Sequence, residues 1–253
     1  MFTLSPRSRP SAPTQRTRRR TPARSLVCLA AAMAALAVPA IIVVAPAQAL
    51  DPRGVGPRNP QTGGFPTFYT DDAGRAARLC LNGKALCGGA GQGNFKAPNG
   101  EAFYWSAESD LRAPGIDVSV EFALEAAFAV KGRPIVFDRL RIRGHVSEAG
   151  SYTVTTPYGD FTVRAADPAE QRNVNTTHDK GCGPAGPGLC TFRRATHGRI
   201  TTFLRQVGAP KGFYGNPNFF RPVTNGASVS ISGPAGSDSS DRFAVMGKKS
   251  RGQ

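Results

Sequence analysis

The clearest pattern in this chain is a strict alternation of apolar and polar residues between Ile116 and Glu125. Ile, Val, Val, Phe and Leu occupy the even positions from 116 to 124, while Asp, Ser, Glu, Ala and Glu fill the odd positions. Successive side chains of a β-strand point to opposite faces, so a period of two predicts a half-buried strand. An α-helix would not bring every second residue to one face. We therefore expect residues 116–125 to form a strand with one face in the core.

The same period returns between residues 136 and 146. Val136, Leu140, Ile142 and Val146 share one parity, and arginines occupy positions 139, 141 and 143 of the other parity. This segment is expected to be a second half-buried strand, with its apolar positions inside and its arginines facing solvent.

Further strands are expected on both sides of these two. Residues 147–150 are typical of a turn, after which Tyr152 and Val154 alternate with threonines and predict that the chain reverses into a hairpin. The other expected elements are a short strand at 78–81, a strand at 161–163, a strand or short helix at 198–205, closing strands at 227–232 and 242–246, and a long surface connection over 165–188.

Composition sets the fold class. Glycine (29) and proline (21) are frequent among the 253 residues, which disfavours long helices. Short strands, many turns and no heptads predict an all-β fold, an antiparallel β sandwich or a barrel-like domain. We expect one β-rich domain over residues 64–247. A disordered lead-in rich in Gly, Pro and Arg precedes it at 50–63, and a basic tail follows at 248–253.

The first 49 residues have the three parts of an export signal peptide. Seven arginines and no acid occupy the first 25 residues, and an uncharged run follows from Leu26 to Val44. Ala47-Gln48-Ala49 then supplies the small residues that a signal peptidase accepts. We expect cleavage before Leu50, no stable membrane span afterwards, and an extracellular, secreted protein. The alternative is a chain anchored by this segment uncleaved, because its 19 apolar residues are enough to span a bilayer.

Four cysteines remain after such cleavage, namely Cys80, Cys87, Cys182 and Cys190. An even number in an exported protein predicts disulfides. Three pairings are possible, and the short separations favour Cys80–Cys87 and Cys182–Cys190, whose intervening stretches are rich in turn formers. Structural zinc sites usually place two to four residues between paired cysteines, whereas six and seven lie between these. We therefore expect two local disulfides and no metal.

The charge of the chain points to acidic partners. Seven of the 32 lysines and arginines lie in the predicted signal, so the remaining 25 face 17 acids and the mature chain carries a net charge of +8. Outside a cell, such a protein meets cell-wall polymers of the teichoic-acid kind, anionic lipid surfaces and acidic polysaccharides. Nucleic acid is a poor partner for an exported chain without a known binding motif. The alternative is a soluble basic protein with no such partner, because the basic residues are scattered.

Several motifs resemble those of a family of exported bacterial proteins of unknown function. They are Gly64-Phe-Pro-Thr-Phe-Tyr-Thr-Asp-Asp-Ala-Gly74, Leu79-Cys-Leu81 with Leu86-Cys87, Glu101-Ala-Phe-Tyr-Trp-Ser-Ala-Glu108, Gly150-Ser-Tyr-Thr-Val-Thr-Thr-Pro-Tyr-Gly159 and Phe243-Ala-Val-Met-Gly247. The resemblance covers most of the predicted mature chain. It implies a β-rich exported domain and no particular activity.

A shorter motif is similar to the tyrosine-corner region of immunoglobulin-like sandwiches. Glu148-x-Gly150-x-Tyr152 has the spacing of that region. The cysteines do not fit the inter-sheet disulfide of the immunoglobulin fold, so the motif implies sandwich architecture alone.

Two adjacent aromatic residues are the candidate sugar-binding site. Tyr104 and Trp105 lie in an aromatic run between Glu101 and Glu108, and rings beside paired carboxylates suit a glycosidase or a sugar-binding surface. The alternative is core packing, because consecutive aromatics in a strand must place at least one ring inside.

Three arginines are the candidate polyanion site. Arg139, Arg141 and Arg143 would form a basic stripe on one face of a strand, where guanidinium groups can contact phosphates or sulfates. The alternative is an ordinary solvated face whose arginines pair with acids across the strands. Asp117, Glu121 and Glu125 are the available partners.

Motifs for catalysis or for cofactors are missing. His145, His178 and His197 are isolated in sequence, without a nucleophile, zinc-protease or phosphate-loop motif. Asp71 to Gly74 predicts a turn and lacks the ligand spacing of an EF-hand. We expect an exported non-catalytic β domain that acts at or outside the cell surface, without a cofactor, and binds anionic polymers or carbohydrate. The alternative is a secreted hydrolase with an unrecognised active site, which a histidine beside two carboxylates in a pocket would favour.

Overall fold

Antiparallel strands dominate the structure, a computed structural model that describes residues 53–81, 84–87, 101–129, 133–181 and 191–250. All of these residues belong to the compact unit Ala47–Gln253. The expected all-β fold of the sandwich or barrel-like kind is confirmed. The predicted signal peptide and the cysteines Cys182 and Cys190 lie outside the described residues, so export and the second disulfide stay predictions.

The strands and short 3-10 helices follow one another along the chain. They are β1 (Arg58–Asn59), η1 (Pro60–Thr62), β2 (Phe65–Pro66), β3 (Tyr69–Thr70), β4 (Ala76–Arg78), η2 (Lys84–Cys87), β5 (Glu101–Ala113), β6 (Ile116–Ala129), β7 (Arg133–Val146), β8 (Gly150–Thr156), β9 (Gly159–Ala165), β10 (Val174–Gly181), η5 (Phe192–His197), β11 (Arg221–Pro222), β12 (Val229–Gly233), β13 (Gly236–Ser240) and β14 (Arg242–Lys249).

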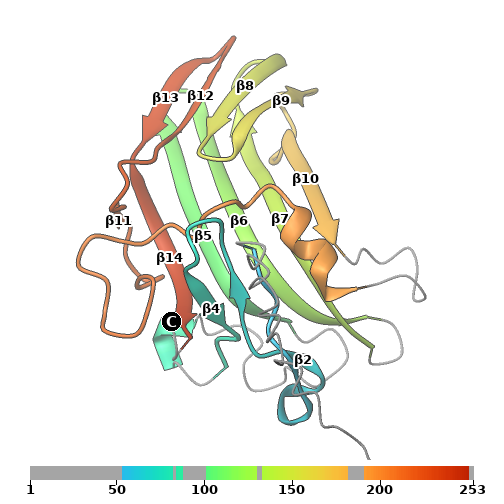
Figure 1. Cartoon of the computed structure of the whole chain (residues 1–253). Helices are drawn as coiled ribbons and strands as arrows, with labels where there is room; N and C mark the ends of the chain where they lie inside the picture. The colour runs from blue at the N-terminus through green and yellow to red at the C-terminus, as the bar shows by residue number, and fades with distance from the viewer. Residues whose placement is uncertain (1–52, 82–83, 88–100, 130–132, 182–190, 251–253) are drawn as a thin grey trace, which may run out of the picture. The chain divides into compact units, whose positions relative to one another are not determined.

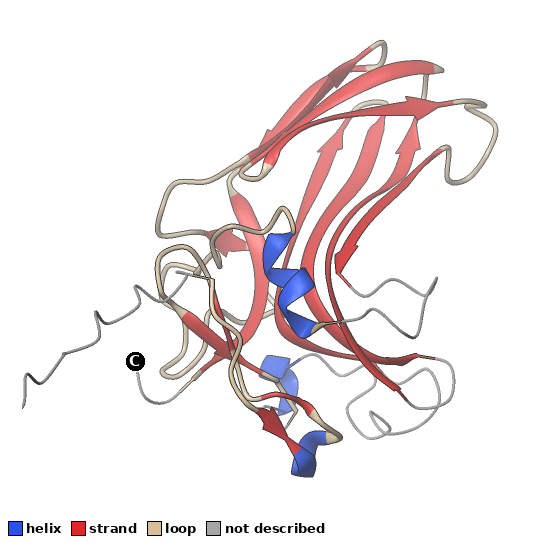
Figure 2. Ribbon diagram, turned by 45° about the vertical axis from the view of Figure 1, so that its right-hand side comes forward, coloured by secondary structure: helices blue, strands red, loops and turns tan. Residues whose placement is uncertain are grey.

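Two sheets carry most of the core. Within the described residues, the larger sheet has the strand order β10-β7-β6-β5-β14-β4-β3, with β11 also paired to β14. The smaller sheet has the order β13-β12-β8-β9. Figure 1 shows the long strands from β14 across to β10 side by side. Figure 2 shows how strongly this sheet curls, with the smaller sheet across one of its ends.

Strand β6 has the predicted alternation. Its even residues from Ile116 to Leu124 are all buried, whereas Asp117 is exposed and Glu121 half-buried on the opposite face. On β7, Leu140 and Ile142 are likewise buried. We call the face that carries these apolar residues the inner face of the larger sheet, and the opposite face, which carries the arginines of β7, its outer face. A two-residue turn, Pro114-Gly115, joins β5 to β6, and the φ of 81° at the glycine suits a residue without a Cβ.

The structure corrects two of the expected connections. The hairpin expected around the turn at residues 147–150 does not form, because β8 pairs with β9 and β12 rather than with β7. The expected surface connection over 165–188 contains strand β10, which pairs along its whole length with β7.

The ends of the β-rich region also extend beyond their expected limits. Part of the expected disordered lead-in has defined structure, because β1 pairs with β2 and Val55 bridges to Tyr69. Strand β14 continues through Lys248 and Lys249, which were expected in the basic tail, and both residues pair with β4.

Residues 198–204 cross the inner face of the larger sheet without belonging to a strand. The backbone of this segment does not pair with a neighbouring strand and forms hydrogen bonds with side chains. Four side-chain contacts do this: Asp138 Oδ2 accepts from Ile200 N at 2.7 Å, Asp71 Oδ2 accepts from Phe203 N at 2.7 Å, Tyr158 Oη donates to Thr202 O at 2.6 Å, and Trp105 Nε1 donates to Leu204 O at 3.1 Å. Buried backbone groups need such partners, so these contacts hold the segment in place.

The turn predicted at residues 71–74 is confirmed and supplies one of these contacts. Asp71 is buried, and its Oδ1 accepts from the backbone N–H groups of Ala73 and Arg75 at 3.0 and 2.8 Å. Gly74 N donates to Asp71 O at 2.9 Å and closes the turn. The carboxylate is therefore fully engaged in shaping the loop and in holding Phe203.

Tyr152 links the segment before β8 to the turn between β12 and β13 in the manner of a tyrosine corner. Its hydroxyl donates to Glu148 O at 2.7 Å and accepts from Ala235 N at 3.1 Å. The ring packs so closely on Gly233 that a Cβ at that position would collide with it. The resemblance seen in the sequence therefore extends to the hydrogen bond that defines the motif.

The Cys80–Cys87 disulfide is present, with 5.3 Å between the two Cα atoms. It lies on the outer side of the larger sheet, where Cys80, Cys87 and Met246 form a small second core against Phe103 and Phe213. The disulfide thus closes a loop over the β14–β5 part of the sheet.

Candidate functional site

The aromatic candidates belong to the core. Tyr104 and Trp105 are both fully buried. The register between β5 and β6 shifts between Phe103 and Trp105, so Tyr104 is the extra residue of a β-bulge. The bulge lets two neighbouring rings share the inner face. Their polar atoms are also occupied, because Tyr104 Oη donates to Pro66 O at 2.6 Å and Trp105 Nε1 to Leu204 O. Neither ring is available to stack on a sugar, so the alternative of core packing is correct for this pair.

The arginine stripe lies on the outer face of β7, as expected, and most of its charge is paired. Arg139 contacts both oxygens of Asp179 at 2.9 Å and Glu125 Oε2 at 2.9 Å. Arg141 pairs with Glu121 at 3.3 Å. The cross-strand acids proposed from the sequence are therefore the partners of two of the three arginines, and the stripe as a whole is not a free polyanion site.

Burial also changes the pKa values of the two glutamates in these pairs. Burial raises the pKa of Glu125 above its ordinary value of 4.5, and the Arg139 guanidinium works in the opposite direction. Burial also raises the pKa of Glu121, against the pull of Arg141. Burial and the arginine charge therefore act on these two carboxyl groups in opposite directions.

Arg143 is the member of the stripe without a carboxylate partner among the described residues. Its Nε donates to Asn175 Oδ1 at 3.2 Å. With Arg172 it lines a cleft of about 500 Å³ on the outer face, beside Asp117, whose carboxylate pairs with Arg112 at 2.7 Å. Burial and the nearby charges of Arg141 and Arg172 lower the pKa of Arg143, so cations are crowded at this point.

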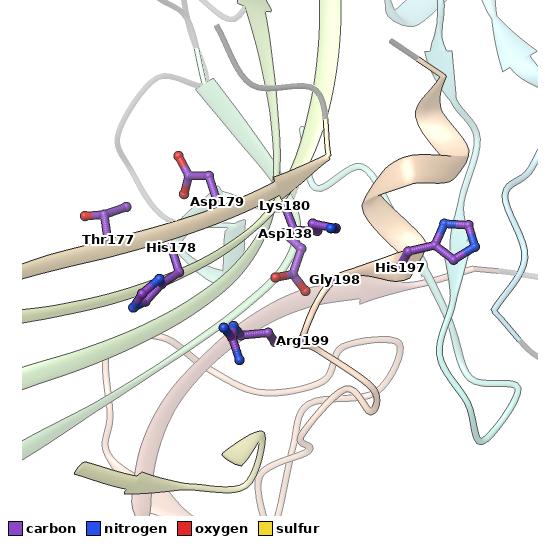
Figure 3. Close-up of a pocket in the computed structure, with 8 residues that line it drawn as sticks. All are labelled: Asp138, Thr177, His178, Asp179, Lys180, His197, Gly198 and Arg199. Atoms are coloured by element: carbon purple, nitrogen blue, oxygen red, sulfur yellow. The ribbon is translucent and has the colours of Figure 1, made fainter. Parts of the chain in front are cut away.

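A second cleft, of about 460 Å³, opens on the inner side of the sheet edge, where β10 and β7 meet the turn after η5. Its lining residues are Asp138, Thr177, His178, Asp179, Lys180, His197, Gly198 and Arg199. Figure 3 shows His178, Asp138 and Arg199 converging from three segments of the chain. Thr177 and Asp179 point to the other side of β10, and His197 points away from Asp138. We call this the β10 cleft.

The β10 cleft carries two cations that are exposed to solvent. Lys180 and Arg199 are exposed, and neither forms an ion pair with a described carboxylate. Asp179 is held by Arg139 on the outer face. The Phe161 ring lies 4.9 Å from Arg199 Cζ and 5.6 Å from the His178 ring, so it keeps the arginine and the histidine together.

Asp138 lies at the bottom of the β10 cleft and also binds the segment that forms one side of it. It is buried on β7, and its Oδ2 accepts from Ile200 N. Burial raises its pKa to about 6, while the N–H groups of Ile200 and Arg199 and the charge of Arg199 lower it. Gly198 packs against this carboxyl group so closely that a Cβ at that position would collide with it. The carboxyl group thus positions Arg199 at the rim.

His178 and Asp138 face each other in this cleft from neighbouring strands. Neither His178 nor His197 has a side-chain hydrogen bond to a serine, threonine or cysteine among the described residues. The second acid of the cleft, Asp179, faces the other side of the strand. In the described part of the chain, no group of three or more His, Cys, Asp or Glu residues is placed to hold a metal ion.

The β10 cleft has no motif of its own in the sequence, although one signal for it is present. Residues 180–237 contain no Asp or Glu and seven lysines and arginines. Two of these seven, Lys180 and Arg199, are the exposed cations of the cleft. The stretch is therefore a basic segment, although the basic residues look scattered when the whole chain is considered.

Comparison of the chain with protein-family models, with curated proteins and with solved structures finds no match. The resemblance to exported bacterial proteins therefore stays a prediction. Among the described residues, no helix is both long enough and apolar enough to cross a membrane.

Proposed function

We propose that this protein is an exported, non-catalytic β domain that binds anionic polymers outside the cell through the β10 cleft. The proposal rests mainly on two exposed cations, Lys180 and Arg199, which line one cleft without an ion-pair partner among the described residues. The basic segment, apolar run and small-residue exit of residues 1–49 support export.

The chemistry of the cleft favours repeated phosphate, sulfate or carboxylate groups. Arg199 offers a planar fork of N–H donors, and Lys180 adds a mobile point charge. His178 supplies a further ring nitrogen at the same opening. The opening lies along an edge strand, so a polymer can pass across it without entering an enclosed pocket. Cell-wall polymers and acidic polysaccharides carry the matching charges.

Binding of linear polyphosphate and of polygalacturonate tests this proposal, with uncharged dextran as the control ligand. Lys180→Glu and Arg199→Glu should each weaken polyphosphate binding about tenfold, since reversing a charge beside a bound anion is worth on the order of 1–2 kcal/mol after screening. Arg164→Glu makes the same change of charge at an exposed position of β9, outside the cleft, and should leave binding nearly unchanged.

Three outcomes would overturn the proposal. Equal binding of dextran and polyphosphate would exclude recognition of charge. Equal losses in all three variants would mean that only net charge matters. Cleavage of a polymer by the purified protein, abolished by His178→Ala, would favour the secreted hydrolase.

A further inference from the structure

The three large apolar side chains that are most exposed in the described residues all lie in one loop. Val207, Phe219 and Phe220 are 53%, 52% and 39% exposed, and they belong to the excursion between residues 205 and 222. Isolated exposed apolar residues are ordinary, but a group of them in one loop indicates a surface that meets an apolar partner. We call residues 205–222 the aromatic loop.

Hydrogen bonds gather these side chains at one place. Val207 N donates to Pro222 O at 2.9 Å, so the first part of the loop lies against its end. A Cβ on Gly208 would lie 3.6 Å from an Arg221 guanidinium nitrogen, and that guanidinium lies 5.4 Å from the Phe219 ring centre. Val207, Phe219 and Arg221 therefore belong to one patch, and Phe220 adjoins Phe219 in the chain.

The aromatic loop is held firmly by a buried glutamine. Gln206 Nε2 lies within hydrogen-bond distance of the carbonyl oxygens of Asn216, Phe219 and Phe243, at 3.3, 2.6 and 2.6 Å. Its Oε1 accepts from Asn216 N at 2.7 Å. The exposure of the phenylalanines is thus built into a fixed backbone, and their rings are not left outside by a loosely packed segment.

Basic residues occur along the whole aromatic loop. Arg205, Lys211 and Arg221 belong to the loop itself, which is part of the acid-free stretch of residues 180–237. Lys249 is adjacent through the hydrogen bond from its N–H to Gly212 O at 2.9 Å. Burial, together with the nearby charges of Arg205 and Arg75, lowers the pKa of Lys249. Arg221 lies beside the Phe219 ring, whereas Lys211 and Lys249 lie farther away, because Gly212 meets β14 at Lys249 and Arg221 pairs with Phe243.

We propose that the aromatic loop docks on an anionic lipid surface. Phenylalanine rings enter the boundary between headgroups and acyl chains, Arg221 beside them contacts the negative headgroups, and the other cations of the loop attract the protein to the surface. A soluble polyanion would satisfy the charges and leave the rings in water, so a bilayer is the partner that matches both parts of the patch. This site is separate from the β10 cleft and does not depend on it.

Co-sedimentation with vesicles tests the inference, using the protein in the form that the producing cell releases. Vesicles of phosphatidylcholine with phosphatidylglycerol should bind the protein, and vesicles of phosphatidylcholine alone should bind it much less. The double variant F219S/F220S should lose about tenfold in partitioning, because the apolar contribution to binding scales with buried area. Its melting temperature should change little, since both rings are already exposed.

Matched variants separate this site from the β10 cleft. Arg221→Gln should weaken binding to the anionic vesicles, whereas Arg164→Gln should not. Lys180→Glu should leave vesicle binding in place, and F219S/F220S should leave polyphosphate binding in place. The inference is overturned if F219S/F220S sediments like the unaltered protein, if neutral vesicles bind as strongly as anionic ones, or if only Lys180→Glu abolishes sedimentation.

Discussion

Replacement of Asp138 by asparagine should change how the stability of the fold depends on pH. The amide side chain would keep an oxygen that can accept from the backbone of residues 199 and 200, but it cannot take up a proton. The carboxyl group is buried and its pKa rises to about 6 from an ordinary value of 3.8. Between these values the folded chain binds the proton more strongly than the unfolded chain does, so the free energy of unfolding falls as pH rises.

The size of the effect follows from the two pKa values. The difference of roughly two units corresponds to about 3 kcal/mol, at about 1.36 kcal/mol per unit. This contribution is fully present below about pH 3.8, is lost as pH rises through about 6, and is then absent near neutrality. The asparagine variant has no such dependence at this position.

Urea unfolding of both proteins, at about six pH values between about 3.5 and 7.5, measures the effect. The free energy of unfolding of the original chain, minus that of Asp138→Asn, should fall by about 3 kcal/mol across this range. Other titrating groups, including Glu121 and Glu125, cancel in the difference. A difference that stays flat or rises with pH would refute the reasoning, because the N–H donors of residues 199 and 200 would then outweigh burial.

Three further predictions concern the core, the disulfide and export. Phe122→Ala should cost about 3–5 kcal/mol of unfolding free energy, because the ring is fully buried and packs edge-on against another aromatic ring. Glu121→Ala should cost less than about 1 kcal/mol. Similar losses for the two variants in thermal or urea unfolding would contradict this prediction. Peptide mapping without reductant should find Cys80 joined to Cys87, and removal of this bond should cost about 2–3 kcal/mol. N-terminal sequencing of secreted material should begin at Leu50, and an intact start found only in membranes would contradict export.

The sequence predicted those strands whose two faces meet different surroundings. Residues 116–124 alternate because one face lies in the core and the other in solvent. Strand β10 escaped prediction because it runs along the sheet edge, where its inward residues His178 and Lys180 open onto the cleft and need not be apolar. Strand β13 is an edge strand too, and its sequence Gly-Ser-Asp-Ser-Ser carries no alternation.

The candidate site was harder to predict because it depends on contacts between distant residues. No local pattern shows that Asp138 binds the backbone at Ile200, 62 positions along the chain. A period of two also cannot place Tyr104 and Trp105 on one face, because the bulge that allows it is visible only in the register with β6. The sequence allowed two interpretations of the arginine stripe, a free basic face or a face paired with acids. The structure shows that Arg139 pairs with two acids.

Charge on this protein is therefore unevenly distributed between its surfaces. On the outer face of the larger sheet, most arginines pair with nearby acids, as Arg139 does with Asp179 and Glu125. In the acid-free stretch of residues 180–237, Lys180 and Arg199 form no ion pair with a described carboxylate. Anions are attracted where positive charge is unpaired, so we propose the β10 cleft, and not the stripe first suggested by the sequence, as the binding site.

Nuclear magnetic resonance of the isotopically labelled, secreted chain, titrated with linear polyphosphate, tests the binding site most directly. The account predicts saturable shifts of the amide signals of residues 177–180 and 197–199 and of the His178 ring, which lessen as salt is added. Dextran should produce none of them. Shifts confined to Arg139, Arg141 and Arg143 of β7, or no shifts at any polyphosphate concentration, would contradict the account.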